Sequence, residues 1–292
     1  MIVVPPSFVA HHPDLADWMA SLPGLAERFL SEWELRPDGE PMHGFAGLVL
    51  PVVQADGVPA ALKMPIRDEQ TRGEADALRA WDGDGAVRLL RHDPDVWVML
   101  LERLDSGRDL RTMADGEAAL IVICKLLRRL HAYAPPDGLP TLAEVAAQMI
   151  EDAPVRAAQA GPDHGRRMRR WADETAEVAT EPGDRLLHWD LHYENTLAGT
   201  REPWLAIDPK PLVGDACFDL WPALWNRWHE VQADPVRVVR RRFDVMVDEL
   251  GLDRDRAVAW TRARMLQNAI WNVEDGEPAI DEIPLVIDDA LG

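Results

Sequence analysis

The sequence is poor in cysteine, in long apolar runs and in basic residues, and each shortage excludes a class of protein. Its two cysteines, Cys124 and Cys217, cannot cross-link 292 residues or form a four-cysteine zinc site. No run of about 18 apolar residues is present, so we expect no transmembrane helix, and the N-terminus lacks the basic region of a signal peptide. With 51 acidic against 31 basic residues, the net charge of −20 disfavours phosphate-mediated binding to nucleic acid. These absences predict a cytoplasmic protein that binds neither nucleic acid nor membranes.

Lysine is scarce as well, because only Lys63, Lys125 and Lys210 occur beside 28 arginines. Each lysine is therefore easy to weigh as a candidate for a specific role. The hydrophobic content of 47% argues against disorder, and 292 residues are enough for one large domain or two modest ones. An acidic excess attracts cationic small molecules, although it also simply keeps a protein soluble.

The hydrophobic pattern changes from strands in the first third of the chain to helices in the rest. Residues 14–36 are spaced for helix, which Pro23 and Gly24 are expected to divide in two. Residues 40–103 read as five strands and one helix, and the helical remainder is interrupted by a hairpin-like island at 185–207. The expected helices lie at 68–81, 117–131, 141–160, 163–179, 215–230, 235–250 and 254–273, and the clearest strands at 48–54, 59–64, 86–91 and 96–101.

This pattern predicts an α+β fold with two lobes. The N-terminal lobe, 1–103, would hold a helical lead-in, a small five-stranded antiparallel sheet and one helix. The C-terminal lobe, 104–292, would be larger and mainly helical. We expect a monomer or a weak dimer.

The most informative segment is 187–195, of sequence LHWDLHYEN, which is followed after a hairpin by Asp208. Phosphoryl transfer from ATP needs a carboxylate that receives the acceptor's proton, oxygen ligands for Mg²⁺ and a cation on the phosphates. Asp190 and Asn195 are close enough in sequence to share one rigid loop, with Asp190 facing the acceptor and Asn195 the metal. The hairpin returns the chain to the same place, where Asp208 meets the metal from the other side, so the set suits Mg²⁺.

The cation of this site is predicted to be Lys63, which lies near the end of an apolar strand. Glu74 lies on the helix that follows and is suitably placed to pair with it. A lone lysine on a strand or a lone glutamate on a helix usually lies on a solvated face. The order Lys63, Glu74, Asp190, Asn195, Asp208 is what turns both into functional candidates.

That order resembles the protein-kinase-like fold. The pattern HxDLHxxN at 188–195, followed by IDPK at 207–210 and by Gly-Asp at 214–215, is similar to the aminoglycoside phosphotransferase family. Together with LRRLHA at 127–132, it is closest to the branch of streptomycin 6-phosphotransferases and hydroxyurea resistance kinases. The resemblance covers roughly residues 40–230.

The resemblance implies a role for each residue of the motif. Asp190 is the general base, Asn195 and Asp208 hold Mg²⁺, and Lys63 with Glu74 grips the α- and β-phosphates of ATP.

It also implies supporting roles outside these five residues. His188 braces the catalytic loop, and Asp215 hydrogen-bonds that loop from a helix start. The adenine lies against the linker that contains Glu102 and Leu104.

The sequence departs from the family pattern in two places. Trp189 stands where the commonest form of the family has glycine, which we do not interpret as a loss of activity. The nucleotide loop is poor in glycine and offers only Gly44 and Gly47, so an ordinary turn is the alternative there. The role of Lys210 is left open between contact with phosphate and bracing of the loop.

Three other classes of protein were weighed against a kinase. A metallohydrolase would use His188, Asp190 and His192 on one face of a strand, but it lacks a clear fourth ligand. A P-loop enzyme is excluded because the chain contains no Gly-Lys pair. A non-catalytic kinase-like binding protein is disfavoured because every expected catalytic residue is present.

The acceptor is the least determined part of the prediction. Indole rings and carboxylates in the helical lobe suit a polycationic sugar, although most tryptophans belong to cores. The candidates are Trp228, Glu230, Trp271 and Glu274. We expect an ATP- and Mg²⁺-dependent kinase that acts on a small, preferably cationic hydroxyl acceptor such as an aminoglycoside of the streptomycin type. Another antibiotic, hydroxyurea and a metabolite alcohol are the alternatives.

Overall fold

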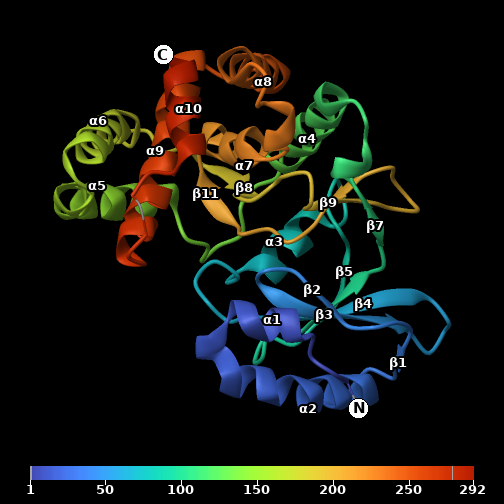
Figure 1. Ribbon diagram of the computed structural model, residues 1–292. Helices are drawn as coiled ribbons and strands as arrows, with labels where there is room; N and C mark the ends of the chain where they lie inside the picture. Colours follow the sequence, from blue (N-terminus) through green and yellow to red (C-terminus); the bar gives the residue numbers. More distant parts are fainter. Residues whose placement is uncertain (1, 278) are drawn as a thin grey trace.

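A six-stranded antiparallel sheet forms one end of the molecule and a helical assembly forms the other (Figure 1). The computed structural model describes residues 2–277 and 279–292. The strand order is β1-β3-β4-β6-β5, with β2 also paired to β3. The bounds are β1 Arg36–Pro37, β2 Met42–His43, β3 Gly47–Val53, β4 Pro59–Pro65, β5 Leu89–His92 and β6 Met99–Glu102. Six strands replace the expected five because two very short strands, β1 and β2, pair side by side along β3.

Alternation along β4 decides which side chains face the cleft and which face a separate core. Leu62 and Met64 are buried in an apolar cluster with α2, whereas Ala61 and Lys63 line the opposite face. The helices of that cluster, α1 Pro6–His11 and α2 Ala16–Glu32, lie on the side of the sheet away from the helical assembly (Figure 1). The sheet therefore presents Lys63, the predicted cation, on its face toward the helical assembly.

Two predicted helices have different bounds in the structure. Within the predicted region 14–36, the structure has one continuous helix, α2 Ala16–Glu32, which contains Pro23 and is not divided there. Burial of Met19, Leu22 and Phe29 on the sheet offsets the helix-breaking cost of the proline, about 3 kcal/mol. Helix α3 is only Glu74–Trp81, shorter than the predicted 68–81, because Gly73 adopts a positive φ of 83° directly before it.

The helical assembly agrees with most of the expected segments. A single helix was expected at 215–230, but the chain breaks there into three short pieces because Arg227 adopts a left-handed conformation. Cys124 and Cys217 are free and buried. The helices are α4 Gly116–Leu130, α5 Leu142–Gln159, α6 Pro162–Val178, η3 Ala216–Leu220, α7 Trp221–Trp225, η4 Trp228–Glu230, α8 Pro235–Leu250, α9 Arg254–Glu274 and α10 Glu282–Leu291.

Helix α10 was not expected, because the acidic end of the chain looks like solvated surface. In the structure Asp288 is buried at 2% exposure and accepts hydrogen bonds from Arg262 and Trp171. Arg167 and Arg170 also pair with it. Charge neutralisation by three arginines allows an acidic segment to pack as a helix.

Two small β units carry the loops of the site. β8 Arg185–Leu187 pairs with β11 Leu212–Gly214, and β9 Thr196–Ala198 forms the predicted hairpin with β10 Leu205–Ala206. An unexpected strand, β7 Asp105–Asp109, pairs with β9.

None of the helices in the described residues is long and apolar enough to cross a bilayer. Helix α3 packs in the larger apolar cluster together with the helical assembly. The apolar clusters therefore do not divide the chain at 103/104, and that lobe boundary stays a prediction.

Candidate active site

A cleft of about 660 Å³ lies between the sheet and the β7–β9–β10 unit. It collects residues that are far apart in the sequence. The residues predicted for nucleotide, metal and catalysis that line it are Gly44, Gly47, Lys63, Glu102, Leu104, Asp190, Asn195 and Asp208.

Lys63 is the buried cation of the cleft, at 5% exposure. Its ammonium lies 2.6 and 2.8 Å from the two carboxylate oxygens of Glu74 and also donates to Asp208. Burial alone would lower the pKa of Lys63, but the carboxylates of Asp208 and Glu74 outweigh it and hold that pKa above its ordinary value. Burial, opposed by Lys63, raises the pKa of Glu74 to about 7. The predicted pair is thus formed, and it is coupled to the predicted metal ligand.

The loop that carries Asp190 is held by a buried aspartate that the sequence analysis missed. Asp219 accepts hydrogen bonds from the backbone N–H groups of His188 at 3.0 Å and Trp189 at 2.5 Å, and it also contacts the His131 ring. Asp215, predicted for this role, instead accepts from the backbone of Cys217 and pairs with Arg256. Asp215 does cap a short helix, but that helix start faces Arg256 instead of the loop.

His188 is fully buried and bonded on both ring nitrogens. Nε2 lies 3.1 Å from the carbonyl oxygen of Ile207, and Nδ1 lies 3.4 Å from the backbone nitrogen of Asp190. A carbonyl requires a donor and an N–H requires an acceptor, so these partners fit the neutral ring with its proton on Nε2. Burial lowers the pKa of His188 to about 4, and His188 connects the catalytic loop to the segment that carries Asp208.

Asn195 and Asp208 are brought together by a backbone hydrogen bond of 2.9 Å from Ile207 to the carbonyl of Asn195. The amide nitrogen of Asn195 donates to the Asp190 carbonyl at 3.0 Å, which leaves its side-chain oxygen for a ligand. Burial would raise the pKa of Asp208, but Lys63 outweighs it and lowers that pKa, so this carboxylate is ionised. One carboxylate and one amide oxygen fit Mg²⁺ that is also bound by phosphates.

The geometry does not favour the metallohydrolase alternative. Both ring nitrogens of His188 have backbone partners, and His192 Nδ1 accepts from the Glu194 backbone at 3.2 Å. In the described residues there is no group of three or more His, Cys, Asp or Glu side chains that would hold a metal without further ligands.

The linker and the nucleotide loop have their own constraints. The Glu102 side chain pairs with Arg201 at 2.7 Å and accepts from the Arg88 backbone, so it braces the linker and leaves the cleft to backbone groups. Leu104 is largely buried, at 9% exposure. A side chain at Gly47 would lie 3.0 Å from the backbone of β4. This close approach, more than loop flexibility, accounts for glycine at position 47.

Trp189 has a positive φ of 63°, which a side chain rarely adopts. This conformation explains why glycine is common at the equivalent position in the family pattern. The indole is buried, and the Arg264 guanidinium lies 5.3 Å from its ring centre. Trp189 thus packs against Arg264, which lines a second cavity, at some cost in backbone strain.

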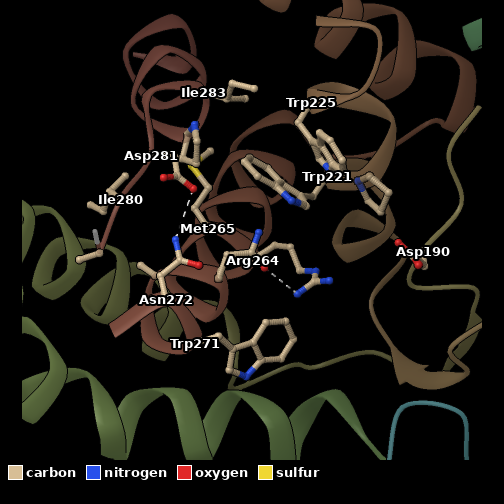
Figure 2. A pocket seen from close by; sticks show the side chains of 15 residues that line it. Asp190, Trp221, Trp225, Arg264, Met265, Trp271, Asn272, Ile280, Asp281 and Ile283 are labelled. Atoms are coloured by element: carbon tan, nitrogen blue, oxygen red, sulfur yellow. Dashed lines mark hydrogen bonds between the residues drawn. The ribbon is translucent and has the colours of Figure 1, made fainter. Parts of the chain in front are cut away.

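That second cavity, of about 360 Å³, also reaches Asp190, which lies at its edge (Figure 2). Trp221 and Trp225 of α7, Trp271 of α9 and Asp281 before α10 contribute to its walls. Arg264 projects from α9 toward the side where Asp190 lies (Figure 2), and burial lowers its pKa to about 10. The described residues that line the two cavities have one member in common, which is Asp190.

Of the four residues predicted for the acceptor, only Trp271 is among the described residues that line this second cavity. Glu230 is paired with Arg227 and, at 2.8 Å, with Arg242, beside a different cavity. Glu274 pairs with Arg156 at 2.7 Å on the surface. Trp228 packs against the main apolar core. Glu230 and Glu274 are thus held in ion pairs with arginines outside the second cavity, and the sequence pattern does not reveal these pairs.

Comparison with known proteins agrees with this geometry. A family model described as aminoglycoside/hydroxyurea antibiotic resistance kinase matches residues 32–276. The chain is 51% identical over 277 residues to streptomycin 6-kinase from Streptomyces glaucescens, a match that covers 94% of this chain and 90% of that protein. It is 50% identical over 278 residues to hydroxyurea phosphotransferase from Kitasatospora aureofaciens, with 94% and 80% covered.

Solved structures of more distant proteins share the fold. Macrolide 2′-phosphotransferase from Brachybacterium faecium superposes with a TM-score of 0.58 at 17% identity, covering 91% of this chain and 97% of that one. Choline kinase from Streptococcus pneumoniae gives a TM-score of 0.55 at 13% identity, covering 91% and 96%. The predicted bilobal, protein-kinase-like fold is confirmed. On the family model and the identity to two kinases over most of its length, the chain belongs to the aminoglycoside/hydroxyurea antibiotic resistance kinase family and is a small-molecule kinase.

Proposed function

We propose that this kinase transfers the γ-phosphoryl group of ATP, with Mg²⁺, to a hydroxyl of an aminoglycoside of the streptomycin type. The observation that carries the proposal is the position of Asp190. Its carboxylate is reached both from the cleft with Lys63 and Asp208 and from the tryptophan-lined pocket. A base at the junction of two cavities receives the proton of a hydroxyl from one side while the phosphoryl arrives from the other.

Each residue of the cleft has a separate role in the reaction. Lys63 holds the α- and β-phosphates, and Glu74 fixes Lys63. Asn195 and Asp208 would hold Mg²⁺, which when bound neutralises charge on the β- and γ-phosphates. Asp190 orients the acceptor hydroxyl and takes its proton, while Asp219 keeps the loop in place through two backbone N–H groups.

The second cavity supports an aromatic, polar acceptor site. The indoles of Trp221, Trp225 and Trp271 line it, and indole faces attract cations such as guanidinium groups. The Trp271 ring already holds the guanidinium of Arg264, 5.3 Å from its centre. Asp281 is exposed and adds a carboxylate on the α10 side (Figure 2). The relatives named streptomycin 6-kinase are 51% identical to this chain, which favours the streptomycin type within the aminoglycosides.

Hydroxyurea is the second candidate acceptor, because a hydroxyurea phosphotransferase is 50% identical to this chain. A cavity of about 360 Å³ is much larger than a molecule of so few atoms requires. The size of the pocket therefore favours the sugar.

A panel of acceptors tests the proposal. The purified kinase is given radiolabelled ATP, Mg²⁺ and either streptomycin, an aminoglycoside of another ring type, hydroxyurea or a simple alcohol. We expect labelled product with streptomycin, at a kcat/KM well above that for the others, and a gain of one phosphate by mass spectrometry. Asp190→Asn is the control for enzyme-borne activity. Preference for hydroxyurea would overturn the acceptor assignment and leave the kinase assignment intact.

A further inference from the structure

Among the basic residues that line the nucleotide cleft, Lys210 has the side chain with the fewest contacts to charged or polar groups of the described residues. Four lysine and arginine side chains line that cleft. Lys63 is shared between two carboxylates, Arg103 donates to backbone carbonyls of the sheet, and Arg111 is held by two carboxylates. Within the described part of the chain, the ammonium of Lys210 contacts one charged group, the carboxylate of Asp190.

The backbone fixes Lys210 beside the reacting groups. Its N–H donates to the carbonyl of His188 at 3.0 Å, which ties it to the catalytic loop. It follows Asp208 by two residues, so the same short segment carries the metal ligand and this lysine. Its Nζ lies 3.0 Å from Oδ2 of Asp190, and its side chain is 20% exposed. The ammonium thus lies beside the predicted base, on the segment that also carries the predicted metal ligand.

The hydrogen-bonding capacity of this ammonium exceeds what the protein uses. A lysine ammonium has three N–H donors, and one ion pair with Asp190 occupies a single direction. Asp190 in turn has a second oxygen, Oδ1, for the acceptor hydroxyl. The pair can therefore stay formed while the remaining donors of Lys210 meet the phosphoryl oxygens.

We propose that Lys210 is a catalytic residue that donates hydrogen bonds to the phosphoryl group during its transfer while it remains paired with Asp190. This inference rests on the proposed function and assigns a role to a residue which that function does not require. In the step, the acceptor oxygen forms a bond to the γ-phosphorus as the bond from that phosphorus to the bridging oxygen breaks. The electron pair leaves with ADP, the hydroxyl proton goes to Asp190, and Lys210 keeps its three protons throughout.

Chemical labelling tests the contact without relying on turnover. An acyl-phosphate derivative of ATP acylates amines near the γ-phosphate, and with only three lysines in the chain peptide mass spectrometry assigns every label. We expect acylation of Lys210 that excess ATP suppresses, and none at Lys125, which is exposed on α4. Acylation of Lys63 alone, or acylation of Lys210 that ATP does not suppress, would overturn the proposal while leaving the proposed function standing. The absence of labelling at both lysines together with no phosphorylation of any acceptor would overturn both.

Kinetics separate contact with the phosphoryl group from an effect through Asp190. Lys210→Met is expected to lower kcat by about 10²–10³-fold, the usual cost of one lost transition-state donor, with KM for ATP nearly unchanged. Lys210→Arg should recover part of the rate, and Lys125→Met should match the parent. In single-turnover experiments, Lys210→Met should still slow the residual reaction of Asp190→Asn. If it has no effect in that background, Lys210 acts only by positioning Asp190, and the proposal is wrong.

Discussion

The carboxylate of Asp190 is chemically the same as that of any other aspartate in this chain. The groups around Asp190 are what set it apart. Its backbone carbonyl accepts from Asn195, its N–H faces His188, and its carboxylate pairs with Lys210. The loop is therefore fixed independently of the carboxylate. For this reason a change of the side chain is expected to alter the chemistry without displacing the loop.

Asp190→Asn keeps the size of the side chain and removes the proton acceptor. We expect kcat to fall by about 10²–10⁴-fold, the usual contribution of a general base, while ATP affinity changes little. Steady-state kinetics and a nucleotide-binding titration measure the two quantities separately. A variant that retains the parental kcat would show that Asp190 is not the base.

Asp208→Asn is expected to give a different defect. It removes the ionised carboxylate of the proposed metal site and also one contact of Lys63. The Mg²⁺ concentration for half-maximal rate should therefore rise, and added metal should restore part of the activity. A loss of kcat with unchanged Mg²⁺ dependence would contradict the assignment of Asp208 as a metal ligand.

His188 is expected to make the fold sensitive to acid. Its pKa falls from 6.5 to about 4 on burial, so the native state favours the neutral ring. Above pH 6.5 the ring is neutral in both the folded and the unfolded protein. As the pH falls from 6.5 to 4, the unfolded protein takes up a proton that the folded protein does not, so the free energy of unfolding falls by about 3 kcal/mol in total. Urea unfolding of His188→Gln across this range should show a shallower loss of unfolding free energy than the parent. The control His229→Gln, at an exposed site, should keep the parental slope; equal slopes for all three proteins would contradict the neutral buried ring.

At the scale of elements, ion pairs hold α10 in place as one wall of the proposed acceptor pocket. Ile283 and Pro284 of this helix line the pocket, and Asp288 anchors the helix to α6 and α9 through three arginines. The anchor lies away from the reacting groups. Its loss should therefore change stability first and acceptor binding second.

Asp288→Asn removes one of the two carboxylates that pair with the largely buried Arg262, and Glu174 remains as the other. A hydrogen bond to a charged group is worth about 1.5–3 kcal/mol, so we expect a loss of at least that order in the free energy of unfolding. Asp289→Asn is the matched control, because Asp289 is 61% exposed and its pair with Arg167 is worth at most about 1 kcal/mol. Urea denaturation of the three proteins measures both effects, and equal stabilities would show that the Asp288 cluster does not hold α10.

At the scale of the whole molecule, the net charge of −20 and the carboxylate of Asp281 in the proposed acceptor pocket both attract a cation, against the opposing charge of Arg264. The KM for a cationic acceptor should rise several-fold with added salt, because the screening length falls from about 10 Å at 0.1 M to about 3 Å at 1 M. ATP, which is an anion, should show a weaker or opposite trend. Asp281→Asn should reduce the salt dependence, measured by initial rates at several ionic strengths. A KM that does not change with salt would contradict electrostatic recognition of the acceptor.

The sequence by itself determined the order of the catalytic residues and the kind of fold. Asp190 and Asn195 lie on one short loop, and a hairpin returns Asp208 to it, so local geometry is enough to join them. Alternation along β4 likewise places Lys63 on the cleft face. These features depend on contacts between residues close in sequence or on strand periodicity, which a pattern of residue types records.

The tertiary structure alone decided which acids act and which are paired. Glu230 and Glu274 look like acceptor ligands in sequence, yet distant arginines neutralise both. Asp219, which looks like one more acid on a helix, holds the catalytic loop instead of Asp215. The cavity proposed for the acceptor is assembled from α7, α9 and the start of α10. Such partners meet only when elements pack, because the free energy of an ion pair depends on burial and distance, and neither is written in the sequence.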